Sequence, residues 1–198
     1  MENVKLSIIY YSQTGNNFKL AKIAQKAAEE AGAEVRLRKV EELLDTSHAD
    51  HNEGWKKYLE ESKDVPVASS DDLEWADAIL FSMPTRFGNV PAQMKFFIDQ
   101  QGGLWADGKL VNKAVSAMTS AQNKNGGEEQ TINHLYTSMF HWGAIIVPQG
   151  YTDDSVYAQG GNPYGTSVTI DRSGFKDDVE GAVINQTKRL LDIAAKIK

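Results

Sequence analysis

The residues best suited to chemistry begin with a short polar loop near the start of the chain. This loop consists of Ser12, Gln13, Thr14, Gly15, Asn16 and Asn17. Its hydroxyl and amide groups, with the free N–H groups of a following helix, can satisfy a phosphate monoester without a lysine. The loop matches neither a Walker loop nor a GxGxxG fingerprint, which disfavours nucleoside triphosphates and Rossmann-type dinucleotide binding. A simple helix cap explains the same residues equally well, because Ser, Thr and Asn are preferred caps.

A second candidate is a turn that directly follows a hydrophobic segment. It consists of Pro84, Thr85, Arg86, Phe87, Gly88 and Asn89. Such a turn can offer backbone N–H and C=O groups to the polar edge of a flat ring such as isoalloxazine, while Phe87 covers apolar surface. Arg86 can stabilise negative charge on the reduced ring. An isolated arginine on an ordinary surface turn is the alternative interpretation.

Two further stretches carry groups of interest. The loop at 119–127 has small and amide side chains that can approach a flat ring closely, or that simply connect two elements. Its candidate residues are Ser120, Ala121, Gln122, Asn123 and Gly126. Further along, His141 stands beside Trp142, and Trp105 lies upstream. A histidine near aromatic residues is more often structural than catalytic, and Trp105 alone favours packing.

Alternating strands and helices must position these candidates. The patterns predict strands at 6–11, 33–40, 77–85, 113–121 and 144–151, and helices at 18–31, 90–101, 128–143 and 177–197. This alternation predicts a mostly parallel sheet of about five strands with helices on both faces. Ligands of such sheets bind at the carboxyl ends of the strands. The segment 45–70, expected to be a loop with one short helix, and the glycine-rich segment 152–172 do not fit the alternation.

Length and composition limit the classes of protein to consider. The 198 residues suit one domain, 1–198, and 41% apolar with 24% charged residues is typical of globular proteins. Without cysteine, disulfides and thiolate chemistry are excluded, so redox chemistry requires a bound cofactor. The charge of −6 in mixed sign disfavours nucleic acid. With no apolar run of ~20 residues and no secretion signal, we expect a cytoplasmic protein without a membrane span.

Several longer stretches resemble one known family. They are PTRFGN (84–89), FIDQQGGLWADGKL (97–110), GGEEQTI (126–132), VPQGY (147–151) and GGNPYGTS (160–167). They are similar to the WrbA family of NAD(P)H:quinone oxidoreductases, and the similarity extends over most of the chain. The resemblance implies a flavodoxin-like, doubly wound fold that binds FMN. It also implies NADH or NADPH as co-substrate, quinones as acceptors, no metal and a homotetramer.

The resemblance also implies roles for individual residues. The loop from Ser12 to Asn17 would hold the flavin phosphate. The turn from Pro84 to Asn89 would line the isoalloxazine, and Ser120 to Asn123 with Gly126 would close the other side. A histidine matching His141 approaches the flavin from a neighbouring subunit in this family. Trp105 and Thr14 would contact the stacked substrates.

From these observations we expect a two-electron enzyme in which nicotinamide and quinone use the same flavin face in turn. Arg86 would stabilise the reduced ring and His141 would hydrogen-bond the quinone or supply its proton. Two alternatives remain open. A one-electron carrier resembling flavodoxin would show a stabilised semiquinone and negligible nicotinamide oxidation. A non-enzymatic, flavin-dependent binding module would retain flavin without turnover.

Overall fold

A parallel sheet forms the centre of the protein in this computed structural model, which describes residues 4–171 and 174–198. The strand order in the described residues is β2-β1-β3-β4-β6-β7, and β5 pairs separately with β4. The strands are β1 (Lys5–Tyr10), β2 (Glu34–Lys39), β3 (Ala78–Pro84), β4 (Ala114–Ala121), β5 (Ile145–Ile146), β6 (Ser167–Asp171) and β7 (Gly174–Phe175). All pairs are parallel except β6 with β7. The expected doubly wound α/β architecture is confirmed. The described residues form a seven-stranded sheet where about five strands were predicted, because β6 also pairs with β4 and β7 adds a short antiparallel strand.

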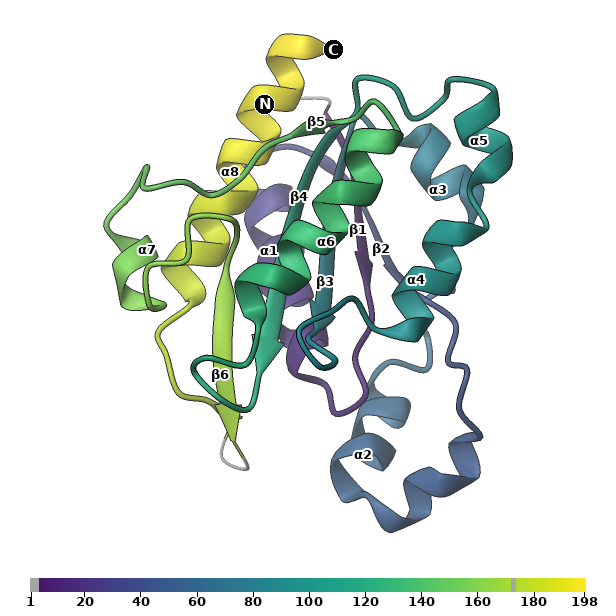
Figure 1. Cartoon of the computed structure of the whole chain (residues 1–198), viewed down its shortest axis with the longest axis vertical. Helices are drawn as coiled ribbons and strands as arrows, with labels where there is room; N and C mark the ends of the chain where they lie inside the picture. Colours follow the sequence, from purple (N-terminus) through teal and green to yellow (C-terminus); the bar gives the residue numbers. More distant parts are fainter. Residues whose placement is uncertain (1–3, 172–173) are drawn as a thin grey trace.

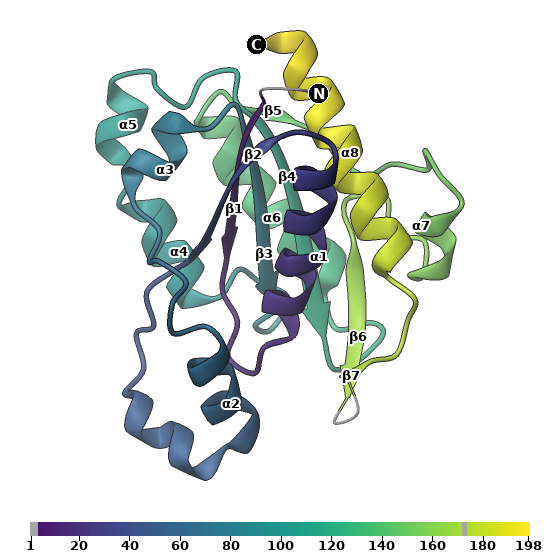
Figure 2. The ribbon, with the colours of Figure 1, turned by 180° about the vertical axis from the view of Figure 1, so that it is seen from behind.

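Helices cover both faces of the sheet. The helices α1 (Asn16–Glu30) and α8 (Glu180–Ile197) lie on one face. The helices α3 (Ser70–Trp75), α4 (Ala92–Asp99), α5 (Gly102–Ala106) and α6 (Glu128–His141) lie on the other (Figures 1 and 2). Alternate residues of β1 divide between the two cores: Ile8 packs with α1 and α8, and Ile9 packs against the opposite helices. β3 and β4 are buried along their whole length, as expected for central parallel strands.

The end of α1 shows how local sequence sets an element boundary. Gly32, just beyond the helix, has a φ of +83°, a conformation that glycine adopts without steric cost. The Gly32 N–H donates to the Glu29 carbonyl and the Ala33 N–H donates to the Ala28 carbonyl, both at 3.0 Å. These two bonds form a Schellman cap, so the glycine predicted to end this helix does so.

The fifth strand differs from the prediction. Only Ile145–Ile146 of the expected strand 144–151 pairs with β4. The segment then leaves the sheet, forms α7 (Ser155–Ala158) and returns as β6, which pairs with Thr119–Ala121. At the return, a Cβ on Gly165 would lie 2.0 Å from the Ala117 carbonyl oxygen, so only glycine permits this approach. The prediction was wrong because two separate segments pair with β4. β5 pairs with the start of β4, and β6, about twenty positions further along the chain, pairs with its end.

The segment 45–70 has more structure than expected. It contains the 3-10 helix η1 (Thr46–His51) and α2 (Glu53–Glu61), where we expected one short helix. Tyr58 of α2 is buried against Tyr10 of β1 and Phe18 of α1, with ring centroids 6.5 and 5.9 Å apart. This aromatic contact fixes α2 beside the carboxyl end of the sheet, at the lower edge in Figure 1. None of the helices described is long and apolar enough to cross a membrane.

Candidate functional site

The polar loops converge on one cavity at the carboxyl ends of β1, β3 and β4. The cavity has a volume of ≈ 230 Å³. Its lining residues are Ser12, Gln13, Thr14, Asn16, Asn17, Asn52, Pro84, Thr85, Arg86, Ser120, Ala121, Gln122 and Ile170. Most of these were predicted from the three loops, and parallel pairing brings the loops to the same edge of the sheet.

The start of α1 provides the anion-binding end of the cavity. Gly15 precedes the helix with a φ of 87°, and its position lacks a side-chain cap. The first-turn N–H groups are therefore not used by a capping side chain, and the helix dipole favours a negative group there. Asn16 donates to the Thr14 hydroxyl oxygen at 3.3 Å, which leaves the hydroxyl proton of Thr14 for a ligand. This donor set fits a phosphate monoester.

Asn17 has a second role that the sequence did not indicate. Its side chain is buried and joins α1 to two central strands. The Asn17 amide donates to the Ser82 hydroxyl at 3.2 Å, and the Ser120 hydroxyl donates to the Asn17 side-chain oxygen at 2.6 Å. The Asn17 side chain thus fixes the position of the start of α1 relative to β3 and β4, and it also lines the cavity.

The opposite end of the cavity is a tight hairpin turn. Arg86 and Asn89 exchange backbone hydrogen bonds of 2.9 and 3.0 Å. Between them, Phe87 has a φ of 53° and Gly88 a φ of 74°. The turn holds Phe87 fully exposed, in a backbone conformation that is uncommon for a bulky residue. A large apolar side chain presented in this way beside a polar cavity suits stacking contact with a flat ligand.

Close backbone contact joins this turn to the loop after β4. A Cβ on Gly127 would lie 2.6 Å from the Gly88 Cα, and one on Gly126 would lie 2.7 Å from the Ala121 Cβ. The Thr131 hydroxyl of α6 also donates to the Thr85 hydroxyl at 2.7 Å. The predicted residue Gly126 therefore acts through loop packing and does not line the cavity.

Arg86 is the cationic residue among those that line the cavity. Its guanidinium donates to the Gln13 side-chain oxygen at 3.1 Å and to the Thr85 carbonyl at 3.3 Å. The side chain therefore connects the first and second loops while remaining exposed. A positive group held at the opening can neutralise negative charge that develops on a bound ring.

Other predicted residues lie around the cavity or far from it. Gly15, Phe87, Gly88, Asn89 and Asn123 belong to the converging loops without lining the cavity. His141 and Trp105 lie elsewhere. His141 ends α6, whose 14 residues carry the chain about 21 Å away from the loop after β4. In Figure 1 this end of α6 and the helix α5 lie at the upper edge of the protein, opposite α2.

His141 and Trp105 contact each other at that distant edge. The Trp105 indole N–H donates to the His141 carbonyl at 2.8 Å. Together with Gln101, Ser138 and Trp142 they line a separate groove. Trp105 is 57% exposed. Within one chain, neither residue reaches the cavity, so the flavin and substrate contacts implied for them stay predictions.

The sequence reasoning missed Asn52 and Ile170 as cavity residues. Asn52 caps α2, accepting the Trp55 N–H at 3.0 Å, and an asparagine before a helical pattern is a readable cap signal. Its place at the cavity depends on the packing of Tyr58, which local patterns do not reveal. Ile170 belongs to β6, within the segment expected to be irregular.

Two buried tyrosines at the end of β1 have raised pKa values. Burial raises the pKa of Tyr10, with a further contribution from Tyr58. Burial also raises the pKa of Tyr11, whose hydroxyl donates to Glu42 at 3.1 Å. Both phenols at the end of β1 therefore remain protonated at neutral pH. In the described part of the chain, no group of three or more His, Cys, Asp or Glu side chains could hold a metal.

Solved structures define the class of fold. A WrbA-like flavodoxin from Agrobacterium tumefaciens is similar with a TM-score of 0.67 at 21% identity, covering 99% of this chain and 100% of that one. A flavodoxin from the domain Archaea gives a TM-score of 0.57 at 15% identity, covering 98% and 99%. The protein therefore has the flavodoxin-like fold.

Sequence relatives define the family. The profile of the family described as NADPH-dependent FMN reductase matches residues 4–156, and the chain belongs to this family. A Deinococcus radiodurans protein named NAD(P)H dehydrogenase (quinone) is 49% identical over 194 residues, covering 98% of this chain and 97% of that protein. A Brucella anthropi protein of the same name is 39% identical over 205 residues, with 98% of each covered. These relatives, with the WrbA-like fold neighbour, confirm the predicted WrbA-type resemblance.

Proposed function

We propose that this protein is an FMN-dependent NAD(P)H:quinone oxidoreductase that transfers electron pairs in a ping-pong sequence. The observation that carries the proposal is the single cavity in which an uncapped helix start meets an arginine-bearing turn. The relatives named NAD(P)H dehydrogenase (quinone), which align over nearly the whole chain, support the same activity.

The residues present fit FMN. Ser12, Thr14 and Asn16, with the N–H groups of the first turn of α1, would hold the phosphate. The turn at 84–89 and the loop at 120–123 would flank the ring, and Phe87 would cover part of its apolar surface. When bound, FMN supplies two-electron redox chemistry, accepting a hydride from nicotinamide and passing electrons to a quinone. The absence of cysteine agrees with redox chemistry that resides in a cofactor.

Arg86 would contribute charge stabilisation. Its hydrogen bond to Gln13 keeps the guanidinium at the cavity opening, where it can oppose negative charge on a reduced ring. The contact also orders an exposed side chain before a ligand arrives. Arg86 therefore both orients the first loop and lowers the energy of the charged state.

One binding place would serve both substrates. Because the turn that carries Arg86 and Phe87 is exposed beside the cavity, a nicotinamide that leaves would make room there for a quinone. The chain's task is to hold two flat molecules in sequence and to restrict their orientation. Steady-state kinetics should give parallel double-reciprocal lines for the two substrates. Intersecting lines would contradict the shared place.

A homotetramer would complete the site with His141 and Trp105 of a neighbouring copy. Neither residue lines the cavity of its own chain, and Phe140, which precedes His141 on α6, is exposed. There His141 would hydrogen-bond the quinone oxygen or supply its proton. His141→Ala should lower turnover about tenfold without changing FMN affinity, and light scattering should show a tetramer. Unchanged turnover, or a monomer with full activity, would contradict this arrangement.

The test of the overall proposal begins with the purified protein. FMN titration should quench flavin fluorescence, and FMN should co-elute in gel filtration. NADH and NADPH oxidation should then depend on added benzoquinone. Tight FMN binding without turnover would indicate a binding module, and a stabilised semiquinone with negligible nicotinamide oxidation would indicate a one-electron carrier. Failure to bind FMN would refute the site itself.

A further inference from the structure

A large groove adjoins the phosphate end of the cavity and extends beyond the site described so far. Its volume is ≈ 1090 Å³, and it shares Thr14, Asn16, Asn52, Gln122 and Ile170 with the cavity. Its further lining residues are Lys19, His51, Glu53, Gly54, Lys57, Asn123, Asp171 and Gly174. The groove therefore lies between α2 and the β6–β7 hairpin, across the start of α1, and is continuous with the cavity.

The cavity is too small to hold a whole nicotinamide dinucleotide in addition to a flavin. Ligand pockets usually measure about 300–1,000 Å³, and the cavity of ≈ 230 Å³ lies below this range, so a bound flavin would leave no room in it for a second large ligand. A nicotinamide dinucleotide adds a pyrophosphate and an adenosine that must lie outside it. A recess that connects with the cavity can take this second half while the nicotinamide reaches the ring.

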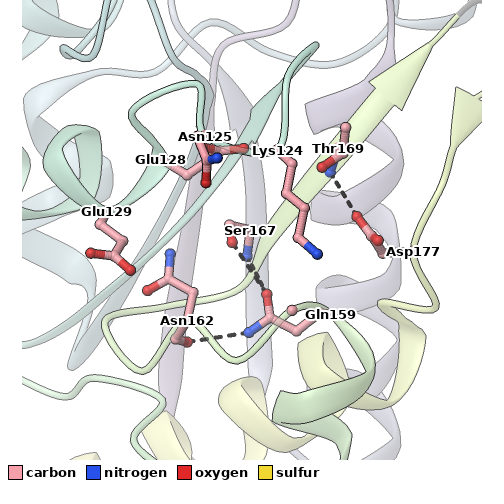
Figure 3. A pocket seen from close by; sticks show the side chains of 10 residues that line it. Lys124, Asn125, Glu128, Glu129, Gln159, Asn162, Ser167, Thr169 and Asp177 are labelled. Atoms are coloured by element: carbon pink, nitrogen blue, oxygen red, sulfur yellow. Dashed lines mark hydrogen bonds between the residues drawn. The ribbon is translucent and has the colours of Figure 1, made fainter.

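Two recesses flank β6, and their charges differ. The one shown in Figure 3 carries Glu128, Glu129 and Asp177 against Lys124. Burial raises the pKa of Glu128, and the nearby Asp177 and Glu129 add to the effect. Three carboxyl groups against one ammonium make this recess unsuited to a pyrophosphate, which carries negative charge.

The large groove is less acidic, with two lysines against two carboxylates, Glu53 and Asp171. Lys19 and Lys57 line it, and His51 adds an imidazole. Of its two carboxylates, Asp171 already pairs with Lys176 at 3.3 Å. Lys57 pairs with Glu61 at 3.6 Å, on a helix surface where such pairs are weak. Lys19 is exposed, and within the described residues no ion pair engages it. Lys19 is thus the cation best able to meet an incoming anion.

We propose that this groove receives the adenosine diphosphate half of the nicotinamide substrate, with Lys19 as its main phosphate contact and Lys57 as a second. The inference rests on the proposed function and adds where the substrate's second half binds. It also gives the segment 45–70 a role, because α2 forms one wall of the groove. Lys19 and Lys57 are binding residues and take no part in electron transfer.

The direct test uses ADP as the probe and the FMN-loaded protein. Isothermal titration calorimetry should detect saturable ADP binding, about fivefold weaker in Lys19→Gln and weaker still in Lys19→Gln with Lys57→Gln. Lys22→Gln is the matched control, because Lys22 is an exposed lysine one turn further along α1 that lines neither the groove nor the cavity. Its affinity for ADP should match that of the unmodified protein.

Kinetics provide an independent measurement. Lys19→Gln should raise the KM for NADH and NADPH about fivefold while kcat and the KM for benzoquinone stay constant, because quinones lack the ADP half. A protein that turns over but binds no ADP, or an unchanged KM in Lys19→Gln, would overturn the inference alone. A protein that oxidises neither nicotinamide would refute the proposed function.

The adenylate of FAD is the competing occupant, since it would extend from the same flavin phosphate. Titration of the flavin-free protein with FMN and FAD separates the two cases. We expect Lys19→Gln to leave both flavin affinities unchanged. A selective loss of FAD affinity in this variant would assign the groove to the flavin and overturn the inference.

Discussion

The two ends of the cavity are built by different means. At the phosphate end, buried hydrogen bonds from Asn17 to Ser82 and Ser120 tie the start of α1 to the central strands. At the ring end, two glycine turns touch through their backbones, and Phe87 stands fully exposed. The phosphate end is therefore fixed by the core, whereas the ring end depends on close contact between loops and leaves an open stacking surface.

The largest effect should come from the contact between the two turns. Gly127→Ala would place a Cβ 2.6 Å from the Gly88 Cα, at a φ of +90°. We expect a loss of about 3 kcal/mol in the free energy of unfolding and no FMN retention, from steric overlap and backbone strain together. Chemical denaturation and gel filtration with FMN measure both.

Gly88→Ala is the matched control for this contact. No atom lies within 4 Å of a Cβ at Gly88, although its φ is +74°. Only the conformational cost of about 1 kcal/mol applies, and FMN should be retained. Equal losses in the two variants would show that strain alone, and not the contact of the turns, matters at the ring end.

The second effect concerns the phosphate end. Asn17→Ala removes the side-chain acceptor of the buried Ser120 hydroxyl and a side-chain donor to Ser82, although the Ser82 hydroxyl still donates to the Asn17 backbone carbonyl at 3.2 Å. We expect about 2 kcal/mol of lost stability together with weaker FMN binding. Asn16→Ala removes only a bond to Thr14 at the surface, so it should weaken FMN binding with little change in stability. Thermal unfolding without FMN and flavin titration separate the effects. If both variants were equally stable, the buried hydrogen bonds of Asn17 would not be the interactions that fix the start of α1.

Sequence patterns located most of this architecture because the three loops each follow a strand, and parallel strands end at one edge. They did not locate Asn52, whose place depends on Tyr58 packing against Tyr10 and Phe18, more than 35 positions away. The edge strand was misplaced for a similar reason, since Gly165 and β6 are selected by contact with β4. The separation of His141 from the cavity could have been predicted. The helix α6 begins beside the loop after β4, so its last residue, His141, lies at the far end of the helix.

A third prediction tests the charge at the opening. Arg86→Ala should lower kcat/KM for the quinone about tenfold while stability stays within about 0.5 kcal/mol, because the side chain is exposed. Arg86→Lys retains the charge and should recover part of the activity. Steady-state kinetics with benzoquinone provide the measurement. Full activity in Arg86→Ala would show that Arg86 does not stabilise charge on the bound ring.

The smallest effect concerns Glu128, which directly follows the glycine turn and is buried. Burial raises the pKa of this carboxyl in the folded protein, so ionisation is less favourable there than in the unfolded chain. Stability associated with the protonated form is therefore present at low pH and lost as pH rises through the folded pKa.

Glu128→Gln keeps the neutral shape and cannot ionise, so its Tm relative to the unmodified protein should rise by about 1–2 °C between roughly pH 4 and pH 8. Exposed Glu41→Gln is the matched control, because Glu41 does not contribute to the raised pKa of Glu128, and it should show a constant difference. Differential scanning calorimetry across this range measures both. A flat profile for Glu128→Gln would mean that the loop opens enough to hydrate the carboxylate, and the ring end would then be looser than its glycine contacts indicate.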